Sequence, residues 1–465
     1  MKLSMNLAAM LLGVLSFVGL NVARADGVAW PPGLPGAKEG TATLRSQQFL
    51  AIPASVAEAR SKNGAAEFIL AKQPPTIDLA YHGDLGPDAA NRRLWSSWGD
   101  ICLASDGKVY VGLGDHGDDA GGDARCFLYQ WDPQANALKQ VVDVNSLLPD
   151  IQPHSRWSKL HAKIDEGPDG KIYFSATLND GNRAGKENYH WSEQTPGGQL
   201  YRYDPKTGKA EIFASLPPKR CTATSLVDLE RKLWWCNLEA GEGGALFALD
   251  LTSGKPVFQA ADGSMGFNRN FALAKDGSIY FNGPDGSLWK CDGKTHALVA
   301  TQSTWGDSPG MRCSTAETKQ GEIYGITHKT SQLFRYRPAE DKLELLGPNW
   351  LAGSYTAVCV LSPDERFVYY LPGSHGGAFK DGTPVVQYEI ATGRRKVLAF
   401  LAAACEKELG YVPAGTYGIK ISADGSTLYV NFNGHPADPL RPEKMKPIGF
   451  GLTAFAAIQI PDSER

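Results

Sequence analysis

The chain repeats one pattern of apolar and polar positions seven times: an apolar stretch, a tight polar turn, and a second apolar stretch that carries an aromatic residue. Residues 106–110 (Asp-Gly-Lys-Val-Tyr) form the first copy and residues 169–173 (Asp-Gly-Lys-Ile-Tyr) the second. Asp-Gly between two alternating strands favours a β-hairpin, because Gly adopts a positive φ without steric cost. The aromatic residues that mark the seven copies are Tyr110, Tyr173, Trp234, Tyr280, Tyr324, Tyr369 and Tyr429.

A second hairpin is expected after each of the first six copies. In the second unit its leading strand covers residues 200–205, a turn covers 204–208, and a short fourth strand covers 210–213. Four strands per unit, repeated at intervals of roughly 45–60 residues, are typical of β-propellers. The sequence therefore predicts an all-β protein, a seven-bladed β-propeller.

The last unit has only three expected strands, at residues 417–422, 427–432 and 452–460. A closed ring must not leave a strand edge unpaired. We therefore expect an N-terminal strand at residues 76–81 (Thr-Ile-Asp-Leu-Ala-Tyr) to close the last blade. The expected organisation is a leader over residues 1–25, an N-terminal wrap and closing strand over 26–97, and the propeller over 98–465.

The N-terminus has the pattern of a secretory signal peptide. Lys2 is followed by an apolar run from Leu7 to Val22 and then by Ala23-Arg24-Ala25, so cleavage is expected after Ala25. A membrane anchor is the alternative, although the run is short for a transmembrane helix. We expect a mature protein without a membrane span, in the periplasm or outside the cell.

Eight cysteines are compatible with that compartment. None belongs to a C-x-x-C pair or a haem-attachment motif, so the spacing indicates neither zinc nor haem. The even number allows disulfides, for which Cys221 with Cys236 and Cys102 with Cys126 are the candidate pairs, each within one blade. Buried free thiols are the alternative.

Candidate chemistry gathers on one rim of the predicted ring. Residues just before the first strand of a blade and just after its second strand lie on the same rim, and five of the nine histidines occupy such positions. Imidazoles suit proton transfer or metal binding, and Arg312 adds a fixed cation. The candidate catalytic residues are His161, His116, Tyr189 and Arg312. The candidate substrate-binding residues are Trp98, His190, Asn268, Arg269, His328, Tyr355, His375, Tyr417 and His435.

These residues predict a cleft for an anionic oligo- or polysaccharide, because aromatic rings can stack on a sugar and Arg312 can hold a carboxylate. The formal net charge of -3 gives no electrostatic reason to expect nucleic acid as a partner. Each rim residue also has a purely structural interpretation, as a hydrogen-bonded loop residue or a packing aromatic. No organic cofactor is expected.

A divalent cation is a further candidate. Residues 115–123 form a Gly-rich acidic loop that contains Asp115, Asp118, Asp119 and Asp123. Ca²⁺ prefers several carboxylate and carbonyl oxygens from a flexible loop, so these residues are the candidate calcium ligands. The EF-hand pattern is not matched, since no Glu closes the loop, and a solvated surface loop is the alternative.

The second blade carries a resemblance to a known family. His161-Ala-Lys-Ile, then residues 169–174, then residues 197–204 (Gly-Gly-Gln-Leu-Tyr-Arg-Tyr-Asp) are similar to secreted seven-bladed propeller polysaccharide lyases, such as ulvan lyases and rhamnose–glucuronate lyases. The resemblance implies that His161 is one of two catalytic histidines. The position of the second falls near Leu178, so His116 or His190 would have to replace it.

Three functions are consistent with these observations. In the first, a lyase cleaves a uronic-acid-containing glycan by β-elimination: Arg312 neutralises the carboxylate, His161 removes the C5 proton, and Tyr189 or His116 protonates the leaving oxygen. In the second, a gluconolactonase-like hydrolase of lactones or esters holds a metal in the central channel, to which Asn268, Asn270 and Asn282 would contribute. In the third, the propeller binds carbohydrate or protein without catalysis.

Overall fold

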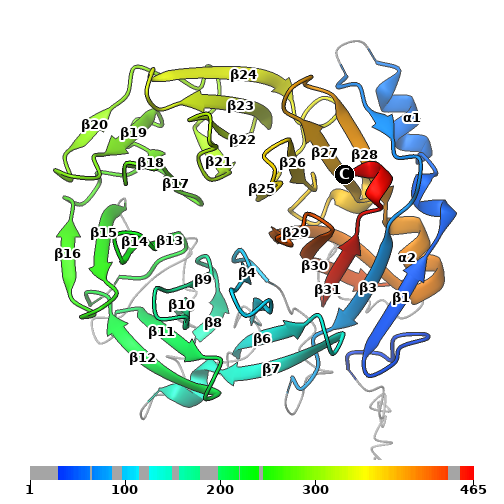
Figure 1. Cartoon of the computed structure of the whole chain (residues 1–465), viewed down its shortest axis with the longest axis horizontal. Coiled ribbons are helices and arrows are strands. Elements are labelled where there is room, and N and C mark those ends of the chain that lie inside the picture. The colour runs from blue at the N-terminus through cyan, green and yellow to red at the C-terminus, as the bar shows by residue number, and fades with distance from the viewer. Residues whose placement is uncertain are drawn as a thin grey trace, which may run out of the picture.

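The structure is a computed structural model that describes residues 30–62, 65–85, 97–114, 125–148, 157–178, 197–218, 220–239, 244–437 and 451–465. Seven mainly antiparallel sheets are arranged radially around a central axis, as Figure 1 shows. The prediction of a seven-bladed β-propeller is confirmed. The expected leader, residues 1–25, lies outside the described residues.

Each blade presents its first strand to the axis and its last strand to the outside (Figure 1). The first blade consists of β4 (Cys102–Leu103), β5 (Val109–Gly114), β6 (Cys126–Asp132) and β7 (Ala137–Asp143). The second consists of β8 (Trp157–Leu160), β9 (Asp165–Glu166), β10 (Ile172–Leu178), β11 (Gln199–Asp204) and β12 (Lys209–Ser215). The third consists of β13 (Ser225–Asp228), β14 (Leu233–Leu238), β15 (Ala245–Asp250) and β16 (Pro256–Gln259).

The next three blades follow the same order. The fourth consists of β17 (Ala272–Leu273), β18 (Ile279–Asn282), β19 (Leu288–Cys291) and β20 (Leu298–Ala300). The fifth consists of β21 (Met311–Ser314), β22 (Ile323–Thr327), β23 (Gln332–Arg337) and β24 (Lys342–Pro348). The sixth consists of β25 (Cys359–Leu361), β26 (Phe367–Tyr370), β27 (Pro384–Glu389) and β28 (Arg395–Phe400).

The repeated Asp-Gly-x-x-Tyr pattern has a local physical cause. Gly107 adopts a φ of 80° in the turn between the first two strands of its blade, a conformation that favours glycine. The carboxylate of Asp106 accepts a hydrogen bond from the backbone N–H of Lys108 and another from the Tyr110 hydroxyl at 3.1 Å. Asp and Tyr therefore fix the turn and the start of the second strand together.

The seventh blade consists of β29 (Tyr411–Ile421), β30 (Thr427–Pro436) and β31 (Leu452–Gln459), and β3 (Thr76–Tyr81) pairs with β31 in antiparallel register. The predicted closing strand is thus confirmed. A further N-terminal strand, β1 (Thr41–Arg45), pairs with the outer edge of β3. The short β2 (Ile69–Leu70) adds a parallel strand to the outer edge of β28 in the sixth blade.

Helices are few among the described residues. The two α-helices are α1 (Ala54–Arg60), on the outside of the ring, and α2 (Ala402–Leu409), between the sixth and seventh blades (Figure 1). Short 3₁₀ helices cover Gln47–Leu50, Val144–Leu147, Ala378–Asp381 and Asp462–Glu464. Neither α-helix approaches the length and apolarity that crossing a bilayer requires.

The core lies between neighbouring blades. Trp131 of the first blade, for example, packs against Phe455 of the seventh, with ring centroids 5.1 Å apart. Such contacts between sheet faces join each blade to the next and leave the inner strands to line the axis.

All eight cysteines are free thiols in the structure. Cys102 is opposite Tyr110, and Tyr110 is opposite Gln130, so Cys102 and Cys126 are two strands and four residues apart. Cys221 is opposite Glu239, three residues beyond Cys236 on the facing segment. A disulfide requires Cα atoms within about 7 Å, so this register does not allow either candidate pair to be bridged.

Candidate ligand site at the mouth of the central channel

A cavity of about 430 Å³ occupies the centre of the ring. Its lining comes from the inner strands and from the residues that precede them. At the rim where these strands begin, the cavity is lined by Trp98, His161, Arg269, Arg312 and Tyr417. Further along the same strands, Asp100, Lys163 and Lys420 line it. These eight residues come from five blades, and the whole lining of the cavity comes from all seven.

Close backbone packing brings Trp98 and His161 to this wall. A Cβ atom at Gly99 would lie 2.4 Å from the carbonyl oxygen of Ala162, so only glycine allows the first blade to approach the second this closely. The rings of Trp98 and His161 are consequently neighbours, with centroids 6.4 Å apart.

Seven aromatic and imidazole rings follow one another around the rim, and we call them the rim belt. Neighbouring ring centroids along the belt are between 4.8 and 6.4 Å apart. The belt runs from the fourth blade through the fifth, sixth, seventh and first to the second. Its members, in order, are Phe267, His328, Tyr355, His375, Tyr417, Trp98 and His161.

Arg312 lies beneath the middle of the rim belt. The register of β21 against β22 shifts between Met311 and Cys313, so Arg312 is at a β-bulge, a device that redirects a side chain. Its Nε donates to the Tyr355 hydroxyl at 2.5 Å and its Nη1 to the Ala357 carbonyl at 2.8 Å. The guanidinium carbon is 5.2 Å from the ring centre of Tyr355 and 5.8 Å from that of Tyr417.

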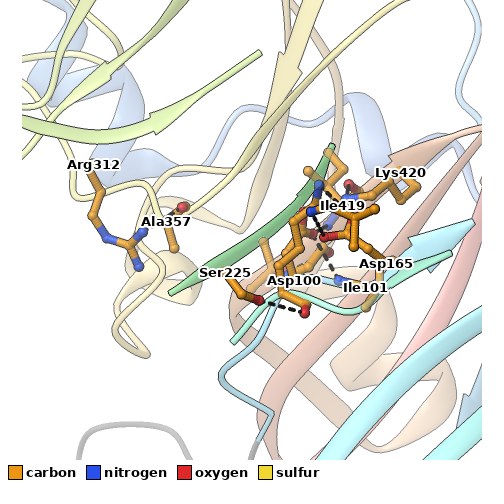
Figure 2. A network of polar contacts seen from close by, with 12 residues as sticks. Asp100, Ile101, Asp165, Ser225, Arg312, Ala357, Ile419 and Lys420 are labelled. Carbon is orange, nitrogen blue, oxygen red and sulfur yellow. Dashed lines mark hydrogen bonds and ion pairs between the residues drawn. The ribbon is translucent and has the colours of Figure 1, made fainter. Parts of the chain in front are cut away.

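The other cations of the cavity wall are neutralised by carboxylates. Lys163 pairs with Asp165 at 2.7 Å, and Arg269 pairs with Glu239 at 2.7 Å. Figure 2 shows Lys420 against Asp100, with Arg312 separate from that cluster.

Arg312 differs from these three cations. Although this residue is only 4% exposed, no carboxylate within the described ranges is at ion-pairing distance from it. A buried charge without a counter-charge is costly, and an anion that entered the cavity would remove that cost.

The imidazoles next to Arg312 are held in their neutral form. Burial lowers the pKa of His328 to about 4, and the positive charges of Arg312, Lys329 and Arg269 act in the same direction. For His375, the surrounding protein limits hydration of the imidazolium and Arg312 adds repulsion, so its pKa also lies below the usual value. A neutral imidazole can accept a proton.

Three other predicted residues have structural partners. Asn268 is buried, and its side chain bonds to the backbone of Gly266 and Asn282. The Arg269 guanidinium is held by Glu239. His435 is paired within β30, where its Nδ1 is 3.0 Å from the Pro436 carbonyl oxygen. The hairpin of β29 and β30 extends several residues beyond the expected strands, so His435 is still paired, with Val412, one residue before the end of β30.

The remaining predicted site residues lie outside the described residues. These are the candidate catalytic residues His116 and Tyr189, the candidate binding residue His190, and the candidate calcium ligands Asp115, Asp118, Asp119 and Asp123. Within the part of the chain that is described, no three His, Cys, Asp or Glu side chains are grouped as a metal site would require.

Phe267 is the member of the rim belt that the sequence did not reveal. It directly precedes Asn268, at the position where residues enter the first strand of the fourth blade. Its rim position could have been read from that spacing. Its contacts with His328 and Arg269 depend on the neighbouring blade and have no local sequence signal.

Comparisons with known proteins support the fold alone. No family model matches the chain, and no curated protein does. Among solved structures, oligogalacturonate lyase in complex with manganese aligns with a TM-score of 0.50 and 11% identity, over 85% of this chain and 99% of that one. A chain of the mitotic checkpoint complex aligns with a TM-score of 0.50 and 10% identity, over 83% and 91%. TolB from Acinetobacter baumannii gives a TM-score of 0.38 and 13% identity, over 58% of each chain.

Proposed function

We propose that the protein binds a uronic-acid-containing glycan at the mouth of its central channel and cleaves it by β-elimination. The observation that carries this proposal is the isolated charge of Arg312. It is the one cation of the cavity wall that has no carboxylate partner within the described residues, whereas Lys163, Lys420 and Arg269 each have one. A uronate carboxylate would supply the missing counter-charge, and the rings of the rim belt would face the sugar.

The first step of the proposed reaction is removal of the C5 proton. Arg312 binds the uronate carboxylate and offsets the negative charge that develops next to it, which makes the C5 proton more acidic. The neutral imidazole of His375 takes that proton. We prefer His375 to His161 as the base because the His375 ring contacts Tyr355, which itself contacts Arg312, whereas His161 is linked to Arg312 only through two ring contacts, by way of Trp98 and Tyr417.

The second step is departure of the C4 oxygen. The electron pair of the broken C5–H bond forms a C4–C5 double bond, and the bond from C4 to the glycosidic oxygen breaks. Tyr355 would protonate that oxygen, since a hydroxyl that accepts from Arg312 can still donate its own proton. The products are an unsaturated uronate and a shortened chain.

The proposal assigns no ligands and no role to a divalent cation. The solved lyase with a similar fold is a manganese complex. Here the described residues do not offer a set of three grouped ligands, and the acidic loop with Asp115 and Asp118 lies outside them. We therefore assign no step to a metal.

The hydrolase alternative has less support. Asn268 and Asn282, which would contribute to a channel metal, bond to the backbone of the fourth and fifth blades. Asn270 donates to the Ser314 hydroxyl at 2.7 Å. These amides hold strands together. A binding propeller without catalysis would use the same Arg312 site and differs from the lyase only in turnover.

The test is turnover of a panel of oligouronates, followed by the ultraviolet absorbance of the unsaturated product. We expect product with the wild-type chain. Arg312→Leu should lower kcat/KM by about 100- to 1000-fold, and His375→Gln should lower kcat by at least about 100-fold. His296→Gln, in an outer hairpin of the fourth blade, is the matched histidine control and should retain full activity.

Two results would count against the proposal, and a third would change the residue that acts as base. Unchanged activity of Arg312→Leu would mean that the reaction takes place elsewhere. Binding of uronates without product across the panel would replace the lyase by the binding propeller. Loss of activity in His161→Gln but not in His375→Gln would transfer the role of base to His161.

A further inference from the structure

The rim belt extends beyond the rings next to Arg312 and reaches an exposed aromatic ring. Phe267, at the fourth-blade end of the belt, has 53% of its surface exposed. A single exposed apolar residue needs no explanation. Phe267, however, continues a line of rings, with centroid steps of 5.0 Å to His328 and 6.0 Å from His328 to Tyr355.

The exposed ring is also held in place. The Arg269 guanidinium carbon is 4.6 Å from its centre, and the His328 ring stacks against it at an interplanar angle of 27°. The Phe267 carbonyl accepts a hydrogen bond from the Asn282 side chain at 2.9 Å. Arg269 is itself fixed by Glu239. A ring ordered before binding loses little conformational entropy when a ligand stacks on it.

We propose that Phe267 is the stacking platform of a distal sugar subsite, so that the ligand is an oligosaccharide that reaches from Arg312 to the fourth blade. This inference rests on the proposed function in one respect, the placement of a carboxylate at Arg312. The path from Tyr355 through His328 to Phe267 is longer than one pyranose ring. The C–H face of a sugar suits the exposed apolar surface of Phe267, and the neutral form of His328 keeps the path free of an additional charge.

The experiment compares affinity with chain length. Titration calorimetry is carried out on His375→Gln, which stops turnover under the proposed mechanism, with and without Phe267→Ala. The ligands are oligouronates from disaccharide to hexasaccharide and a matched series of neutral glucans. We expect affinity to rise with chain length. Phe267→Ala should lower the affinity for the longer oligosaccharides by about three- to tenfold and leave the affinity for the disaccharide unchanged. Phe267→Trp should retain the rise.

Leu229→Ala is the matched control. Leu229 is 55% exposed in the turn between β13 and β14, at the opposite rim, so its removal should change no affinity. If uronates fail to bind but neutral glucans show a rise that depends on Phe267, the proposed function is wrong and the distal subsite stands. Affinity that is independent of length in both series, or an equal loss at every length in Phe267→Ala, overturns the subsite.

Discussion

A single bulged residue determines the chemistry of the channel mouth. The shift in register between Met311 and Cys313 directs Arg312 toward the rings of Tyr355 and Tyr417 and away from any described carboxylate. The same charge that would attract an anion also disfavours the imidazolium form of nearby histidines. The charge of Arg312 therefore favours both the binding of an anion and the neutral form of a neighbouring histidine that can act as a base.

This coupling predicts a change in the pKa of His375 when Arg312 is replaced. Arg312→Gln removes a positive charge near His375, so the pKa of His375 should rise toward the ordinary value of about 6.5. Histidine side-chain resonances followed by NMR across a pH titration measure the shift directly and do not depend on activity. If His375 is the base, the acidic limb of the pH–rate profile belongs to it and should move to higher pH in any variant that raises its pKa.

Lys329→Met provides the control for that titration. The positive charge of Lys329 lowers the pKa of His328 but does not contribute to the shift of His375. Its replacement should therefore raise the pKa of His328 and leave that of His375 unchanged. A His375 pKa that stays constant in Arg312→Gln would show that the two groups are not coupled.

At the scale of elements, side chains connect the inner strands of neighbouring blades. Asp100 of the first blade accepts a hydrogen bond from the backbone N–H of Ile419 in the seventh, at 3.1 Å. Asp165 of the second blade accepts from Val227 of the third, at 3.2 Å. An inner strand is the edge of its sheet, and its unpaired backbone groups need other partners. The carboxylates at the channel wall meet that need and also neutralise the lysines beside them.

Replacing Asp100 should therefore weaken the junction between the first and seventh blades. Asp100→Ala leaves the Ile419 N–H and the partly buried Lys420 without this partner, and should lower the free energy of unfolding by about 2 kcal/mol. Asp100→Asn keeps an acceptor oxygen and should cost about half as much. Urea denaturation followed by circular dichroism measures both. Glu211→Gln, which breaks an exposed pair with Arg202, should change stability by less than about 0.5 kcal/mol. Equal values for all three variants would exclude the proposed role of Asp100.

The elements that the sequence predicted well are those with local causes. The hairpin turns follow from Asp-Gly chemistry within a few residues, as Asp106 and Gly107 illustrate. Helix α2 and the early start of β29 at Tyr411 were not predicted, because they depend on packing between the sixth and seventh blades. For the site, spacing alone placed Arg312, His375 and Tyr355 on one rim. The bulge that directs Arg312 and the partners of Asn268 and His435 required the folded register.

At the scale of the whole molecule, segments far apart in the chain close the ring. The closing strand β3 was predictable from the general rule against open edges, since the last blade had only three expected strands. A second closure was not predictable. Glu464 is buried, and its carboxylate accepts from the backbone N–H groups of Lys72 and Gln73 and pairs with Lys396 at 2.9 Å. One side chain thus ties the segment before β3 to the sixth blade.

The contacts of Glu464 predict a pH-dependent contribution to stability. Burial alone would raise the pKa of this carboxyl, but hydrogen bonds from Lys396 and the Lys72 N–H outweigh burial and hold the pKa below its usual value. A carboxyl whose pKa is lowered by folding stabilises the folded state above its unfolded pKa, about 4.3, and loses that effect as pH falls through the lower folded pKa.

Glu464→Ala should lower the free energy of unfolding by about 3 kcal/mol at neutral pH and by less in acid, because two N–H groups and Lys396 lose their partner. Denaturation at neutral and acidic pH measures the difference, and faster hydrogen exchange at Lys72 and Gln73 would locate it. Glu408→Gln, in an exposed pair with Lys407, should have little effect at either pH. An equal loss for Glu464→Ala at both pH values would mean that its packing, and not its charge, closes the ring.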